Sequence, residues 1–140
     1  MDNNLRRDII LTHYENPTNR GLIEDNSYIH HKKSSSSCID SIELMAKIEE
    51  GIIKDIKFDG EACAICTSVT SIMINTLLGK RLDDAKRIIE EFNKMINEEE
   101  YDKELLGELN VYDEMYKQPS RKNCALLPVE AMRFIIKEVE

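Results

Sequence analysis

One run of alternating side chains constrains the fold of this chain more than any other feature. From residue 42 to residue 48, apolar residues occupy every second position, and mostly charged residues lie between them. A period of two predicts a β-strand with one buried face. Glu50-Gly51 then predicts a turn, and residues 52–59 predict a returning strand that ends at Gly60. The sequence therefore predicts an antiparallel hairpin whose apolar face needs other elements to cover it.

Helical periodicity predicts two elements around this hairpin. Residues 3–14 carry apolar side chains at helical spacing and predict a short amphipathic helix. Residues 67–78 precede Gly79 and predict a buried helix with a face of small polar residues. The polar residues 24–37, which include His30-His31, predict a solvated loop that leads to the hairpin.

The C-terminal half predicts further helices. Asp83 or Asp84 is expected to cap a helix with one apolar face, and Pro128, a residue suited to a first turn, is expected to open the last helix. Residues 97–118 are acidic and predict short helices at about 102–106 and 112–117. The predicted fold is α+β, a single domain over residues 1–140 with a small antiparallel β-sheet and helices packed on one face.

The composition argues against several functional classes. The chain has 140 residues, of which 41% are hydrophobic, and a net charge of −8. This charge disfavours binding to nucleic acid or to an anionic membrane surface, because cations must neutralise the phosphates. Residues 1–8 lack the apolar run of a signal peptide, and no stretch approaches the ~18 apolar residues of a membrane helix. We therefore expect a cytoplasmic protein, in which cysteines bind metals or react more often than they form disulfides.

The four cysteines lie in three short segments, and these segments carry the predicted chemistry. Cys38 stands two residues before Asp40, Cys63 three residues before Cys66, and Cys124 close to the predicted start of the last helix. Three thiolates and one carboxylate are sufficient for a tetrahedral zinc site or for iron with sulfide. We expect Cys63 and Cys124 near helix N-termini, which favour negative charge and lower thiol pKa values. Ordinary buried cysteines, or a redox pair of Cys63 and Cys66, are the alternatives that the spacing leaves open.

Three motifs resemble the U-type iron–sulfur cluster assembly proteins, the family of IscU, SufU and the N-terminal domain of NifU. Residues 13–21 (HYENPTNRG) resemble the opening motif of this family, residues 58–65 (FDGEACAI) its second cysteine segment, and residues 121–128 (RKNCALLP) its last one. The resemblance covers nearly the whole chain. Asn123, where IscU-type members usually carry a histidine, and an insertion at about residues 97–118 both indicate the SufU-like branch.

The resemblance implies zinc bound by Cys38, Asp40, Cys63 and Cys124, with Arg121 as a charge partner near the metal. It implies that Cys38, released from zinc, accepts persulfide sulfur from a SufS-like pyridoxal-phosphate cysteine desulfurase and passes it to a downstream cluster scaffold. Two alternatives stay open on the same ligands: a scaffold that binds Fe²⁺ or assembles a [2Fe–2S] cluster, and a structural zinc module without transfer activity. We expect a relay or scaffold protein rather than a stand-alone enzyme.

The first and second cysteine segments depart from the family pattern. Ile39 stands where family members normally have glycine, so the coordination by Asp40 is less secure than that by the cysteines. Cys66 stands where relatives mostly have serine. We expect Cys66 to be a packing residue, and the alternatives are a substitute metal ligand and a member of a sulfur relay.

Overall fold

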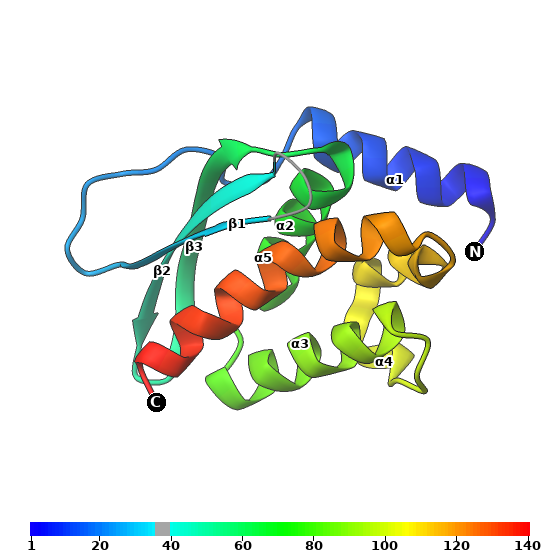
Figure 1. Cartoon of the computed structure of the whole chain (residues 1–140). Coiled ribbons are helices and arrows are strands. Elements are labelled where there is room, and N and C mark those ends of the chain that lie inside the picture. The colour runs from blue at the N-terminus through cyan, green and yellow to red at the C-terminus, as the bar shows by residue number, and fades with distance from the viewer. Residues whose placement is uncertain (36–39) are drawn as a thin grey trace.

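A three-stranded antiparallel sheet with helices on one face organises the fold (Figure 1). The structure is a computed structural model that describes residues 1–35 and 40–140. The strands follow the order β1-β2-β3 and comprise β1 (Ile29–Ser34), β2 (Ser41–Glu49) and β3 (Ile52–Glu61). This arrangement confirms the predicted α+β class.

The hairpin of β2 and β3 forms as the alternating pattern predicts. Leu44 and Phe58 are buried and lie opposite each other on the face that the helices cover. The prediction that Gly60 ends the second strand is wrong by one residue, because Ser41 pairs with Glu61 beyond it. Gly60 has a φ of +145°, and a Cβ at this position would lie 2.2 Å from the carbonyl oxygen of Ser41. Only glycine allows the two strands to approach this closely.

β1 corrects the loop that was predicted over residues 24–37. Residues 29–34 pair with β2 from Ile29 opposite Ala46 to Ser34 opposite Ser41, so His30-His31 belong to a strand. The polar side chains of this edge strand show no apolar alternation, and its position is decided by pairing with β2. The last helix covers it, and the ring of His31 stacks on Phe134 with 3.9 Å between the ring centroids.

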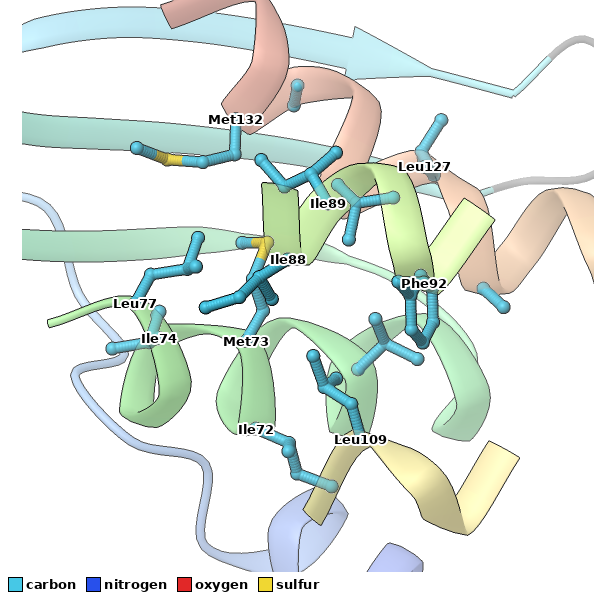
Figure 2. Close-up of a cluster of buried hydrophobic side chains, with 14 of the residues drawn as sticks. Ile72, Met73, Ile74, Leu77, Ile88, Ile89, Phe92, Leu109, Leu127 and Met132 are labelled. Atoms are coloured by element: carbon cyan, nitrogen blue, oxygen red, sulfur yellow. The ribbon is translucent and has the colours of Figure 1, made fainter. Parts of the chain in front are cut away.

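α2 (Ala64–Leu77) is the central helix and confirms the predicted buried helix. α1 (Asn3–Glu15), also as predicted, packs beside it, and so does the last helix. Figure 2 shows the apolar side chains of α2 meeting those of α3 (Leu82–Ile96). The core at this point contains Ile72, Met73, Ile74, Leu77, Ile88, Ile89 and Phe92.

Two helix starts differ from the prediction. Arg81 is the N-cap residue of α3, and Asp83 and Asp84 lie in its first turn, where carboxylates also stabilise the positive end of the helix. α5 (Pro119–Glu138) begins at Pro119, and Pro128 lies inside it. Pro128 has no N–H to donate to the carbonyl of Cys124, four residues earlier. Tertiary packing holds the helix across this missing bond, since both residues are buried.

Residues 97–118 contain three short helices that pack against α1, α2, α3 and α5. These are α4 (Lys103–Leu106) and the 3-10 helices η1 (Gly107–Tyr112) and η2 (Met115–Lys117). α4 and η2 lie close to the two predicted short helices, whereas η1 was not predicted. The hydroxyl of Tyr112 donates to Ser68 Oγ at 2.5 Å, and His13 bridges Ser71 of α2 and Glu108 of η1 at 2.7 Å on each side. This segment is therefore part of the core.

The segment between α1 and β1 covers the free edge and the other face of the sheet. The backbone of Arg20 forms an isolated parallel β-bridge with Phe58 of β3. The N–H of Ile23 donates to Met45 Sδ at 3.4 Å. The hydroxyl of Tyr28 donates to Asp55 Oδ2 at 2.6 Å. Within the two described ranges, no helix has the length and apolar character that crossing a membrane requires.

Candidate metal centre

Three of the predicted site residues converge at one end of the sheet. A carboxylate oxygen of Asp40 and the sulfur atoms of Cys63 and Cys124 all lie within 4.8 Å of one another. Asp40 directly precedes β2, Cys63 is the N-cap residue of α2, and Cys124 lies in the second turn of α5. The fold thus brings together segments that are far apart in the sequence. Cys38 lies outside the described residues.

Asp40 is 1% exposed, and its carboxylate faces Cys63. Its Oδ1 accepts the backbone N–H of Cys63 at 2.8 Å, and its Oδ2 accepts the thiol of Cys63 at 3.3 Å. Its carbonyl oxygen accepts the N–H of Ser35 at 2.9 Å, which continues the pairing of β1 and β2. The carboxylate of Asp40 therefore points at Cys63, whereas Ile39 lies outside the described residues.

Cys63 occupies the helix N-terminus that the sequence predicts. Its backbone is extended, with φ −68° and ψ 172°, so its side chain folds back over the first turn of α2. The sulfur accepts the backbone N–H of Cys66 at 3.5 Å. The thiol of Cys63 therefore lies at the N-terminal end of α2.

Cys124 corrects the prediction that it lies at a helix start. It follows Pro119 by more than one turn and is buried, with 4% of its surface exposed. Burial is the main cause of a raised pKa of the Cys124 thiol, and the nearby Cys63 and Asp40 raise this pKa further. Without a metal the thiol keeps its proton at neutral pH, and a metal ion must displace that proton to bind.

The remaining candidates lie around this centre. Cys66 is fully buried in the first turn of α2 and, among the described residues, does not belong to the group of three. Arg121 is exposed in the first turn of α5, three residues before Cys124. His30 and His31 lie on β1, where His31 packs against α5.

The donor atoms suit a tetrahedral metal ion. Bonds of ~2.0–2.3 Å in a tetrahedron place neighbouring ligand atoms about 3.3–3.8 Å apart, and small side-chain movements are enough to reach such a geometry from the separations found here. Cys63 Sγ and Asp40 Oδ2 are 3.3 Å apart. Two soft thiolates with one carboxylate suit zinc and also iron–sulfur clusters.

Two features of the centre have no signal in the cysteine spacing. The first is the hydrogen bond from the Cys63 N–H to the Asp40 carboxylate, which depends on the pairing of β2 with β3. The second is Arg20, whose guanidinium donates to the carbonyl of Gly60 at 2.8 Å and holds the end of β3. Gly60 itself belongs to the motif of residues 58–65, so the motif does include one of the two residues in this contact.

Comparisons with known proteins identify the family of the chain. Residues 5–127 match the NifU-like N terminal domain. The zinc-dependent sulfurtransferase SufU of Bacillus subtilis (strain 168) is 33% identical over 91% of this chain and 86% of its own length. The iron–sulfur cluster assembly scaffold protein IscU of Thermotoga maritima is 31% identical over 86% of this chain and 84% of its own length.

Solved structures share the fold. FiSufU of Fervidobacterium islandicum AW-1, named for an iron–sulfur scaffold of the SUF system, has a TM-score of 0.85 at 25% identity over 92% of this chain and 94% of its own. An N-terminal NifU-like protein of Brucella abortus has a TM-score of 0.85 at 17% identity over 94% of this chain and 91% of its own. Its similarity therefore concerns the fold alone. With the family match over residues 5–127, the chain belongs to the NifU-like N-terminal domain family of iron–sulfur cluster assembly proteins.

Proposed function

We propose that this protein is a zinc-dependent sulfur acceptor that takes persulfide sulfur from a cysteine desulfurase through Cys38. The convergence of one carboxylate and two thiols within 4.8 Å carries the proposal. Cys38 stands two residues from Asp40 in the sequence, so only a short stretch of chain separates a third thiol from the centre. The name of the Bacillus subtilis relative, zinc-dependent sulfurtransferase, supports the same function.

The proposed metal ligands are Cys38, Asp40, Cys63 and Cys124. Zinc, when bound, would keep the thiolates deprotonated without changing its own redox state. Cys63 and Cys124 are held on helices, and Asp40 is fixed by two hydrogen bonds to Cys63. Four ionised ligands around a divalent ion carry a formal charge of roughly −2. Arg121, in the first turn of α5, is the proposed charge partner.

Cys38 is the proposed acceptor because the family resemblance implies this role, and because it stands two residues before Asp40 in a serine-rich stretch of the sequence. Its thiolate would attack the terminal sulfur of a persulfide on the partner's cysteine. The S–S bond of that persulfide breaks, a new S–S bond forms to Cys38, and the partner's cysteine leaves as a thiolate. The exchange needs no external oxidant. A SufS-like pyridoxal-phosphate cysteine desulfurase is the proposed donor, and a cytoplasmic cluster scaffold is the proposed recipient.

The branch assignment rests on two features. Asn123 stands beside Cys124, where IscU-type members usually carry a histidine, and residues 97–118 form the proposed insertion in a single domain of residues 1–140. In the structure this segment packs on α2, the helix that carries Cys63. Both features favour the sulfur-relay function over a cluster scaffold.

Metal analysis and a desulfurase assay test the proposal together. The protein is purified without oxygen, its metal is measured, and its stimulation of a cognate desulfurase is compared between wild type, Cys38→Ala and Cys66→Ser. We expect bound colourless zinc, stimulation by wild type and Cys66→Ser, and none by Cys38→Ala. Cys66→Ser is the matched control because it also removes one thiol but lies outside the ligand group.

A second function has support from the Thermotoga maritima relative, which is named an iron–sulfur cluster assembly scaffold protein. Fe²⁺ or a [2Fe–2S] cluster would use the same ligands. A brown, labile chromophore in the protein purified without oxygen would establish this alternative. Bound zinc without stimulation of the desulfurase would instead indicate a structural zinc module.

A further inference from the structure

Cys66 is a buried thiol that the proposed function does not use, and it lies one helical turn from the proposed ligand Cys63. The backbone N–H of Cys66 points at the sulfur of Cys63, 3.5 Å away. A separation of three residues in an α-helix places two Cα atoms about 5 Å apart. Disulfides join Cα atoms that are ~4.4–6.8 Å apart. Cys63 is the N-cap residue and Cys66 lies in the first turn of α2, so we expect their separation to be close to this range.

The two thiols differ in exposure, as a redox pair requires. Cys63 is partly exposed at the N-cap position, whereas Cys66 is 0% exposed. Asp40 Oδ2 accepts a hydrogen bond from the thiol of Cys63 at 3.3 Å, and this thiol lies at the N-terminus of a 14-residue helix. An oxidant in solution would reach Cys63 first, and the buried thiol of Cys66 would then form a disulfide with the oxidised Cys63.

Cys124 is the rival partner for Cys63, because these two sulfur atoms also lie within 4.8 Å. Both are proposed ligands, so a bound metal ion engages the sulfur of Cys124. Among the described residues, Cys66 does not belong to the group of possible metal ligands. A bond within one turn of α2 also leaves the packing of α2 against α5 in place. Cys66 is thus the thiol that can respond first when Cys63 is oxidised.

We propose that Cys63 and Cys66 form a reversible disulfide that withdraws Cys63 from the metal centre and releases the metal. The oxidant class is a peroxide. Hydrogen peroxide oxidises the Cys63 thiol to a sulfenic acid with release of one water, and the Cys66 thiol then displaces a second water from that sulfur. In total, two thiols and one hydrogen peroxide give one disulfide and two waters. A dithiol reverses the reaction by exchange. The metal release rests on the proposed function, whereas the disulfide itself does not.

The test uses the full chain, reduced and loaded with zinc without oxygen, in wild-type, Cys66→Ser and Cys66→Ala forms. Each protein is treated with hydrogen peroxide, then with dithiothreitol. Zinc release is followed with a chromogenic chelator, and peptide mapping by mass spectrometry identifies the bond. We expect a wild-type mass loss of about 2 Da, equal to two hydrogen atoms, with Cys63 linked to Cys66. Zinc is expected to leave with this bond and to rebind after reduction.

The serine and alanine variants distinguish a disulfide between Cys63 and Cys66 from nonspecific oxidation of the protein. Both are expected to oxidise Cys63 beyond the sulfenic acid, so that dithiothreitol no longer restores zinc binding. A wild-type map with Cys63 linked to Cys124 or Cys38 would overturn the proposal, and so would equal reversibility in all three proteins. If the reduced protein binds no zinc, the proposed function fails, and the same mapping on the metal-free chain still decides whether Cys63 bonds to Cys66.

Discussion

Gly60 links the stability of the hairpin to the geometry of the metal centre, and replacing it with alanine should damage both. A Cβ at this position would lie 2.2 Å from the carbonyl oxygen of Ser41, whereas real Cβ contacts essentially never fall below 3.0 Å. One of the two strands must therefore move by most of an ångström. Ser41 directly follows Asp40, and Gly60 is three residues before Cys63.

The expected loss of stability has two parts. A non-glycine residue in a sparsely populated backbone region costs about 1–3 kcal/mol, and Gly60 has a φ of +145°. Displacing packed backbone costs about 1–3 kcal/mol more, as overpacking does in protein cores. Gly51→Ala is the matched control, because Gly51 lies at the other end of the same hairpin with a φ of +74° and nothing within 4 Å of a Cβ. This control should lose only the first part.

The movement should also weaken metal binding. The hydrogen bond from the Cys63 N–H to Asp40 Oδ1 is 2.8 Å long, so a displacement of most of an ångström breaks it. Loss of a bond that orients a ligand reduces metal affinity about 10–100-fold. Urea unfolding of the metal-free proteins measures the first effect, and competition with a zinc chelator measures the second. Unfolding free energies of the two alanine variants within about 0.5 kcal/mol of each other would refute the steric argument.

Three further outcomes follow from single contacts. Burial is the main cause of the raised pKa of Cys124, so zinc binding near neutral pH should release a proton from its thiol. Calorimetry in two buffers should therefore find about one fewer proton released on zinc binding by Cys124→Ser than by wild type, and equal proton release would contradict this. Tyr112→Phe removes the hydrogen bond to Ser68 and should lower the unfolding free energy by about 1 kcal/mol, with no change in the m-value; an unchanged midpoint would show that the bond does not stabilise the fold. The hydrogen bond to Asp55 is the main cause that raises the pKa of Tyr28 to about 12. The difference in unfolding free energy between wild type and Tyr28→Phe should therefore be constant below pH 10 and shrink as the pH rises through 12, and a difference that grows in that range would contradict this reasoning.

The elements that sequence predicted well are those whose pattern repeats along the chain. The hairpin follows from a period of two in residues 42–48, and α1 and α2 follow from helical spacing and, for α2, a closing glycine. β1 has no such pattern, because an edge strand with polar side chains takes its hydrogen bonds from its neighbour. Pro128 predicted a helix start because proline suits a first turn, but Pro119 occupies that position.

For the site, the sequence by itself determined the residue types, since three cysteine segments with one aspartate narrow the chemistry to thiolates and a carboxylate. The order of the motifs also determined the family. Only the tertiary structure decided that Asp40, Cys63 and Cys124 meet, that Asp40 fixes Cys63 through its N–H, and that Cys124 is buried beyond the first turn of α5. The reason is physical: distances between segments and the burial of a thiol depend on how strands and helices pack, and no local spacing encodes that packing.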